Sequence, residues 1–266
     1  MSNKKNLDDQ SIQDLFDQAE GDGTLSTTSR QALDIADLGA QIQAGLGVAV
    51  DDVDASEVVL VTVMPDDSGS IRFAGNAEAV RQGHNQIIDA LSASKQAGDV
   101  LMHTRYLNGF VLNPYTAVTQ AVRMDEHNYD PNLGTPLYDQ SVVLLGTVLA
   151  KAQEFLQSGV PVRTVTLIIT DGGDCGSTRH KAKHVKSLVD DMLAAENHIV
   201  AAIGIDDGST DFRQVFRDMG IPDRWVLTPT SSDHDLRQAF NVFSQSAVRA
   251  SQGTRFSQTA LGGFAN

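Results

Sequence analysis

Carboxylate and hydroxyl side chains gather in three short segments of the sequence. These are residues 66–70 (DDSGS), 134–135 (GT) and 171–174 (DGGD). None of the three contains a histidine, and the only cysteine of the chain, Cys175, has no base placed beside it in the sequence. Hard oxygen ligands of this kind suit Mg²⁺, Mn²⁺ or Ca²⁺ and disfavour Zn²⁺ or Cu²⁺. The chemistry that these segments favour is therefore the binding of a hard divalent cation.

The spacing within the first segment supports one shared ion. Ser68 and Ser70 stand two positions apart, so in an extended loop their hydroxyls turn to the same side as Asp66, and Gly69 lets the backbone bend between them. We expect the metal-binding residues to be Asp66, Ser68, Ser70, Thr135 and Asp171. We expect supporting roles beside the ion for Asp67, Gly134 and Asp174. Such a set leaves an octahedral ion short of anionic ligands, so it would keep waters or accept a carboxylate from outside.

The segments before and between these residues predict a parallel sheet. VVLVTVM (58–64) and VTLIIT (165–170) are continuous apolar runs rich in β-branched residues, as in strands buried on both faces. Further strands are expected at 198–205 and 225–229, and helices at 75–94, 137–157, 179–196, 210–218 and 232–250. Such alternation is typical of a sheet covered by helices on both faces. Ligands collect at the carboxyl ends of these strands, which is where Asp66 and Asp171 stand.

One hairpin interrupts the parallel pattern. Asn108-Gly109 lies between two apolar runs and favours a tight turn, because both central positions of a type I′ turn need a positive φ. The sequence therefore predicts a doubly wound α/β domain over about residues 57–250 with one antiparallel strand. Residues 1–56 are expected to form an acidic, partly helical N-terminal extension, and residues 251–266 a flexible C-terminal tail.

Charge is distributed unevenly along the chain. Residues 1–57 contain twelve acidic and three basic side chains, which accounts for −9 of the net charge of −14. The extension is either an arm packed loosely on the domain or a docking arm for a partner. The basic residues of 179–186 form either a solvated helix face or a docking patch, for an acidic partner or for the arm itself. His180 and His184 in this stretch are expected at the surface.

Composition excludes several classes of function. The acidic balance, with a pI near 4.7, argues against nucleic acid or an anionic membrane as the main partner. We expect no signal peptide, because no apolar run follows Lys4 and Lys5, and no apolar run of the sequence is long enough to span a membrane. A single cysteine rules out an internal disulfide and suits a reducing compartment, so a cytoplasmic location is expected.

The combination of Asp66-x-Ser68-x-Ser70, Thr135 and the I-T-D-G of Asp171 resembles the metal-ion-dependent adhesion site, or MIDAS, of von Willebrand factor A (VWA) domains. The resemblance covers about three-quarters of the chain. It implies a Rossmann-like six-stranded sheet of order 3-2-1-4-5-6 with strand 3 antiparallel. It also implies that the serines and the threonine contact the metal directly or through water. The two carboxylates would act mostly through bound water, and the site would have no catalytic activity.

A narrower resemblance concerns possible partners. The stretches PDDSGSI, HNYDPNLGTPLYD and ITDGGDCGS are similar to bacterial intracellular VWA proteins that work beside AAA+ ATPases of the MoxR type. This likeness implies an adaptor protein that binds a partner's Asp or Glu through the metal. Many members of the family have Gly-Gly-Thr where this chain has Leu133-Gly134-Thr135, which leaves the hydroxyl ligand in place.

An enzyme is the alternative that the residues leave open. Asp66-Asp67 at a strand end also suits a phosphotransfer or hydrolase enzyme with a Mg²⁺-binding acidic site. A receiver domain needs a lysine after its fifth strand, where this chain has Ile205-Asp206-Asp207, and a haloacid-dehalogenase-like phosphatase needs D-x-D where this chain has D-x-S. No Gly-rich phosphate loop is present. We therefore expect an interaction module and not an enzyme; a purely structural assembly protein is a third possibility.

Overall fold

The computed structural model describes residues 9–34, 37–252 and 262–264. Its centre is a six-stranded sheet of order β3-β2-β1-β4-β5-β6. The strands are β1 (Val58–Pro65), β2 (Val100–Arg105), β3 (Val111–Ala117), β4 (Val162–Thr170), β5 (His198–Gly204) and β6 (Val226–Leu227). All neighbouring pairs are parallel except β2 and β3, which form the hairpin around Asn108-Gly109. The predicted fold class, strand order and antiparallel strand are confirmed.

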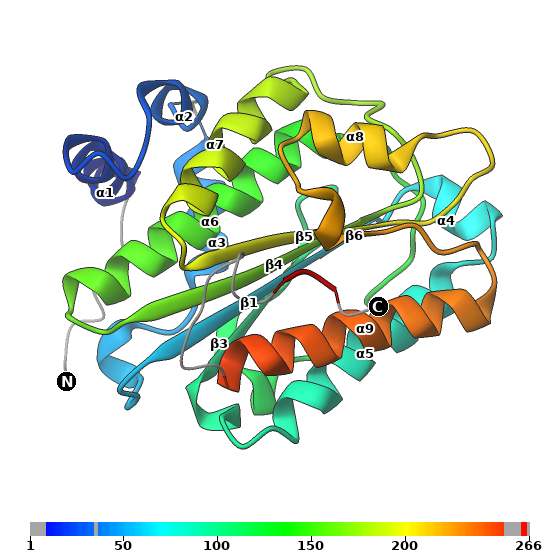
Figure 1. Ribbon diagram of the computed structural model, residues 1–266, viewed down its shortest axis with the longest axis horizontal. Coiled ribbons are helices and arrows are strands. Elements are labelled where there is room, and N and C mark those ends of the chain that lie inside the picture. Colours follow the sequence, from blue (N-terminus) through cyan, green and yellow to red (C-terminus); the bar gives the residue numbers. More distant parts are fainter. Residues whose placement is uncertain (1–8, 35–36, 253–261, 265–266) are drawn as a thin grey trace.

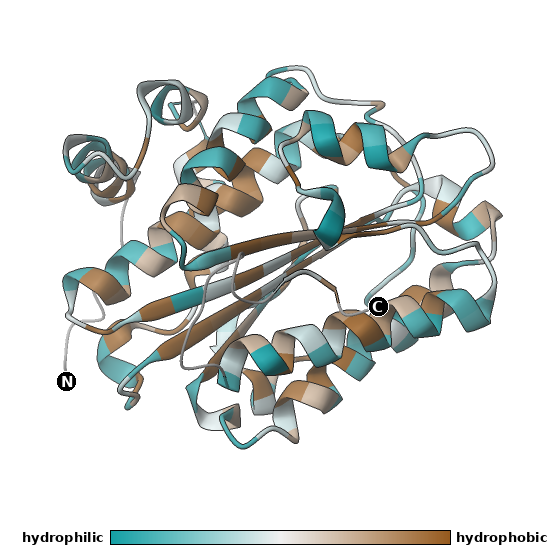
Figure 2. Ribbon diagram, in the orientation of Figure 1, coloured by the Kyte–Doolittle hydropathy of each residue, from teal (hydrophilic) through white to brown (hydrophobic). Residues whose placement is uncertain are grey.

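The strands form where the sequence is continuously apolar. Every residue of β1, β2 and β5 is buried, because helices cover both faces of the sheet. Figure 2 shows this distribution, with brown strands in the centre and teal on the outward sides of the helices. Burial of these β-branched side chains on both faces is the main favourable contribution to folding of the domain.

Helices lie on both sides of the sheet in the order that the alternation predicts. They are α4 (Gly69–Phe73), α5 (Ala77–Ser92), α6 (Leu137–Gln157), α7 (Ala182–Ala194), α8 (Phe212–Asp218) and α9 (Asp233–Gln252). Short 3₁₀ turns are η1 (Val50–Asp52), η2 (Ala97–Asp99), η3 (Val118–Gln120) and η4 (Asp223–Trp225). In Figure 1, α5 and α9 pack together below the sheet, and α6, α7 and α8 lie above it. None of the described helices is long and apolar enough to cross a membrane.

The register of β1 and β4 brings two of the acidic segments to one edge. Pro65 pairs with Ile169, so Asp66 and Asp171 follow at nearly the same height. In Figure 1 this edge is on the right, where β4 ends and α4 begins. The sheet therefore positions the candidate site as the sequence predicts.

The described part of the N-terminal extension packs on the domain through buried apolar side chains. It forms α1 (Asp9–Gly21), α2 (Thr27–Ala32) and α3 (Leu38–Leu46), which pack on α6, α7 and β3. Leu33 and Ile42 are fully buried and belong to the same core as the sheet. They come close to α6 at Gly146, where a Cβ would lie 2.9 Å from Leu33 Cδ2 and 3.0 Å from Ile42 Cδ1. The missing side chain of Gly146 is what lets the extension approach.

The C-terminal stretch was expected to be a flexible tail. Residues 251 and 252 belong to α9, and residues 253–261 and 265–266 lie outside the described residues. The described residues Gly262–Phe264 pack on the domain: the ring of Phe264 lies 5.2 Å from that of Trp225, and its amide donates to the carbonyl of Arg224 at 3.0 Å. The flexible tail stays a prediction.

Candidate metal site

Backbone contacts join the three polar loops at the carboxyl edge of the sheet. Ser68 forms an isolated parallel bridge with Leu133, and the amide of Gly69 donates to the Leu133 carbonyl at 3.0 Å. On the other side, the amide of Cys175 donates to the carbonyl of Thr135 at 2.9 Å. The loop before α6 is thus held between the loops that follow β1 and β4.

Hydrogen bonds connect four of the five predicted ligands. The Oγ atoms of Ser68 and Ser70 are 2.9 Å apart, and Ser70 Oγ donates to Asp171 Oδ1 at 2.6 Å. Asp66 Oδ1 accepts from the amide of Ser68 at 2.8 Å. Two segments separated by about a hundred residues therefore bring hydroxyl and carboxylate oxygens together at one place.

Thr135 is attached to the same edge by its backbone. Its carbonyl accepts from the amides of Cys175 and Leu137, and the residue is only 7% exposed. Thr135 therefore lies between the two acidic loops at the start of α6. Metal binding by its hydroxyl, like the whole set of ligands, stays a prediction.

The two carboxylates of the site are buried. Burial raises the pKa of Asp66 to about 6, although hydrogen bonds from Thr170 and Ser68 oppose the shift. Burial also raises the pKa of Asp171, and the charge of nearby Asp207 adds to this effect. Among the described residues, no Lys, Arg or His forms an ion pair with Asp66 or Asp171. The two buried carboxylates therefore have no cationic side chain to neutralise them among the described residues. Ionisation of both is unfavourable unless another cation is bound.

Asp67 and Gly134 are joined by a residue from the hairpin. The backbone amide and side-chain Nδ2 of Asn108 donate to Asp67 Oδ1 at 3.0 and 2.9 Å. Asn108 Nδ2 also donates to the carbonyl of Gly134 at 2.6 Å. Asp67 thus holds the β2–β3 hairpin against the β1 loop, which is a positioning role.

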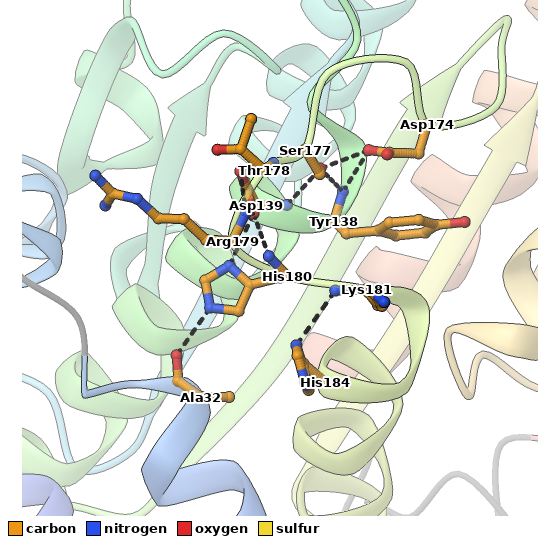
Figure 3. Close-up of polar contacts among 10 residues, drawn as sticks. All are labelled: Ala32, Tyr138, Asp139, Asp174, Ser177, Thr178, Arg179, His180, Lys181 and His184. Carbon is orange, nitrogen blue, oxygen red and sulfur yellow. Dashed lines mark hydrogen bonds and ion pairs between the residues drawn. The ribbon is translucent and has the colours of Figure 1, made fainter.

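Asp174 makes its contacts with the start of α6 (Figure 3). Its Oδ1 accepts from Ser177 Oγ at 2.5 Å and from the amide of Tyr138 at 3.3 Å. The Asp174 carboxylate therefore ties the loop after β4 to α6, and among the described residues it forms no hydrogen bond with the five predicted ligands. Its predicted support of the ion would act through the shape of this loop.

Asp139 holds the second half of the same loop. Its carboxylate accepts the amides of Thr178 at 2.8 Å and His180 at 2.7 Å (Figure 3). These contacts keep residues 178–180 out of helical conformation. For this reason α7 begins at Ala182, three residues later than the sequence predicts.

The surface position expected for His180 was wrong. His180 is buried, with Nδ1 3.0 Å from Asp139 Oδ1 and Nε2 3.0 Å from the carbonyl of Ala32 at the end of α2 (Figure 3). The imidazole therefore connects the loop after β4 to the N-terminal extension. His184 is partly buried and accepts from the Lys181 amide at 3.2 Å.

The extension meets α7 through serines and one aspartate. Ser26 donates from its amide and its hydroxyl to Asp191 Oδ2, at 2.8 Å each. Ser29 Oγ lies 2.9 Å from Ser187 Oγ. Both Ser187 and Asp191 belong to α7 and follow the basic stretch 179–186. Docking of the acidic extension on that basic stretch stays a prediction.

Sequence reasoning missed two residues that hold Asp66. The hydroxyl of Tyr129 donates to the carbonyl of Asp66, and Thr170 Oγ1 donates to Asp66 Oδ2 at 2.6 Å. Burial, followed by the charges of Asp66 and Asp67, raises the pKa of Tyr129 well above its ordinary value, so this phenol is a neutral donor. Thr170 is the threonine of the I-T-D-G segment, so its position next to the site could have been predicted. The residues around Tyr129 do not predict its contact with Asp66.

The donor set fits a hard divalent cation. It combines two carboxylates with serine hydroxyls, all oxygen, and leaves coordination positions for water or an outside carboxylate. In the part of the chain that the structure describes, no group of three or more His, Cys, Asp or Glu side chains is placed to hold a metal. A closed site of the structural zinc type is therefore not built from these residues.

Comparison with solved structures shows the fold. The open form of the pilus adhesin SpaC from Lactobacillus rhamnosus GG has a TM-score of 0.51 at 15% identity, over 74% of this chain and 30% of that chain. The VWA domain of SpRpn10 has a TM-score of 0.50 at 14% identity, over 69% of this chain and 94% of that domain. This chain thus spans about a third of the adhesin. No protein-family profile and no curated protein matches the sequence.

Proposed function

We propose that this chain, which has the VWA fold, is a metal-dependent protein-interaction module. The observation that carries the proposal is the pair of buried carboxylates, Asp66 and Asp171, which are joined to the hydroxyls of Ser68 and Ser70 and have no cationic partner among the residues that the structure describes. A divalent cation supplies the missing positive charge. With only two carboxylates around it, the cation keeps the capacity to bind a third, and this third one comes from a partner protein.

Each residue of the site has a part in this proposal. Asp66 and Asp171 neutralise the cation, while Ser68, Ser70 and Thr135 offer hydroxyl oxygens. The cation supplies a Lewis-acidic position at which an Asp or Glu of the partner binds. Mg²⁺ is the proposed ion because it favours carboxylates with retained waters, and Mn²⁺ or Ca²⁺ would use the same oxygens.

The proposal assigns no reaction to the site. A phosphotransfer enzyme would use Asp66 as nucleophile, yet both of its oxygens accept hydrogen bonds, from Ser68 and Thr170. The sequence resemblance supports a MoxR-type AAA+ ATPase as partner and, together with the lone Cys175, a cytoplasmic adaptor. The acidic composition supports a protein partner over nucleic acid or an anionic membrane.

Calorimetric titration with Mn²⁺ tests the metal site. We expect saturable binding by the wild-type chain, none by Asp66→Ala, and wild-type binding by Asp190→Ala, whose exposed carboxylate pairs with Lys186 on α7. Circular dichroism shows whether each variant is folded. Equal Mn²⁺ binding by a folded Asp66→Ala protein would remove the basis of the proposal.

A capture experiment then tests the interaction. The wild-type chain is used as bait in a lysate with Mg²⁺ and again with EDTA, with Asp66→Ala as control. Proteins retained only with Mg²⁺ and an intact Asp66 support the module, and an AAA+ ATPase among them supports the named partner class. The same proteins in all three samples would show that recognition does not use the metal.

A further inference from the structure

Large apolar side chains stand exposed around the candidate metal site. Phe73 is 89% exposed, Phe110 57% and Leu133 53%. They belong to three different segments, namely α4, the β2–β3 hairpin and the loop before α6. Exposed apolar groups that gather on one surface mark an interaction site more often than single scattered ones.

Two of these residues, Phe73 and Leu133, adjoin the serine loop of the site. A Cβ placed on Gly69, between Ser68 and Ser70, would lie 3.5 Å from the ring of Phe73. Leu133 forms the parallel bridge with Ser68, and its carbonyl accepts from the Gly69 amide. A carboxylate that reached the metal would therefore bring its neighbouring residues over Phe73 and Leu133.

Phe110 is connected to the site by a row of aromatic rings. Its ring lies 5.4 Å from that of Tyr106, which lies 5.3 Å from that of Tyr129. Tyr129 in turn donates to the carbonyl of Asp66. Tyr106 and Tyr129 are buried, so Phe110 rests on a fixed support and costs little conformational entropy when a partner covers it.

The loops of this edge are strongly acidic. Residues 65–76, 106–110, 128–136, 171–178 and 205–211 contain eight aspartates and one arginine. That arginine, Arg72, already forms an ion pair with Asp130. A divalent cation would leave the surface negative, so a partner segment with several acids would be repelled everywhere except at the metal.

From these observations, and resting on the proposed metal site, we propose the chemistry of the partner segment. It presents one Asp or Glu to the cation and carries bulky apolar side chains within two residues of that acid, which cover Phe73, Leu133 and Phe110. It carries no second acid nearby. The metal supplies the attachment point, and the apolar side chains supply selectivity among the many carboxylates on protein surfaces.

Selection from a random peptide library tests this proposal. Twelve-residue peptides displayed on phage are bound to the immobilised chain in Mg²⁺ and eluted with EDTA. We expect enriched peptides to have one acid flanked by Leu, Ile, Phe, Trp or Met. Enrichment of acidic runs, or of acids with polar neighbours, would overturn the inference while leaving the metal module standing. If EDTA elutes no enriched peptide, both the module and the inference are wrong.

Surface variants locate the contact. Phe73→Ser should weaken binding of the best selected peptide at least tenfold, measured by fluorescence anisotropy, and leave Mn²⁺ affinity unchanged. Leu156→Ser is the matched control, because Leu156 is also exposed but lies at the end of α6 away from the site. Asp66→Ala should lose both peptide and Mn²⁺. Equal peptide affinity for Phe73→Ser and Leu156→Ser would show that the aromatic side chain is not covered.

Discussion

The buried Asp66 carboxylate predicts a specific dependence of stability on pH in the metal-free protein. The perturbation is Asp66→Asn, which keeps the shape of the side chain and cannot ionise. The amide can donate to Thr170 Oγ1, whose own proton is then free for the carbonyl of Gly172, 2.9 Å away. The substitution therefore removes a buried negative charge with little loss of hydrogen bonding.

The size of the effect follows from the pKa. Burial raises the pKa of Asp66 from 3.8 to about 6, so the folded state holds its proton more tightly than the unfolded state. Ionisation then disfavours folding increasingly as the pH rises between these values. At about 1.4 kcal/mol per pKa unit, Asp66 costs the wild type about 1 kcal/mol at about pH 4.5 and about 3 kcal/mol at about pH 7.5.

Urea denaturation at several pH values measures this cost. We expect the free energy of unfolding of Asp66→Asn, minus that of the wild type, to grow by about 2 kcal/mol between about pH 4.5 and about pH 7.5 in EDTA. Mg²⁺ at about a hundredfold excess over its Kd should then stabilise the wild type by about 2.7 kcal/mol and the variant not at all. An effect of the substitution on the free energy of unfolding that does not depend on pH is the same at both pH values, so it cancels in this comparison.

Asp174→Asn serves as the control because its carboxylate lies in the same loop system and contacts Ser177. The growth with pH should be larger for Asp66→Asn than for this control. A difference for Asp66→Asn that stays constant with pH would refute the reasoning, since it would mean that the Asp66 charge is not buried. A difference that shrinks as the pH rises would mean that a cationic group already neutralises it.

Three further predictions concern side-chain packing and the hydrogen bonds of the loop after β4. Leu33→Ala should lower the free energy of unfolding, measured in urea, by about 2–5 kcal/mol, because Leu33 is fully buried. A change below about 0.5 kcal/mol would mean that the N-terminal extension packs only loosely on the domain. Gly83→Ala should cost about 1–3 kcal/mol by the same measurement, because the new Cβ would lie 2.2 Å from Phe240 Cδ2; an unchanged midpoint would contradict the packing of α5 on α9. Asp139→Ala should speed amide hydrogen exchange in residues 174–180 and weaken Mn²⁺ binding, because it removes the acceptor for the Thr178 and His180 amides; unchanged exchange would show that the loop is held by other contacts.

The features that could be predicted from the sequence depend on residues that are close together along the chain. The first strand was predicted over 58–64 from a continuous apolar run, and the hairpin was predicted from Asn108-Gly109. Asp66, Ser68 and Ser70 follow β1 directly, so the end of one strand places them together. The strand order came from the resemblance to VWA domains and not from periodicity.

What could not be predicted depends on contacts between distant segments. The Tyr129 hydroxyl reaches the Asp66 carbonyl across 63 positions, and His180 reaches Ala32 across 148. Nothing in the residues around Tyr129 or His180 indicates these contacts. The packing of Leu33 and α3 on α6 depends on the missing side chain of Gly146. In the sequence, a glycine within a predicted helix indicates only a lower helix stability.

The position of Trp225 gives the protein an optical signal of its own. It is the single tryptophan of the chain, it is buried, and the rings nearest to it include that of Phe264 in the described C-terminal residues. Release of that ring would open the indole to water and shift its emission to longer wavelength. Intrinsic fluorescence would therefore follow the docking of the C-terminal residues without a label.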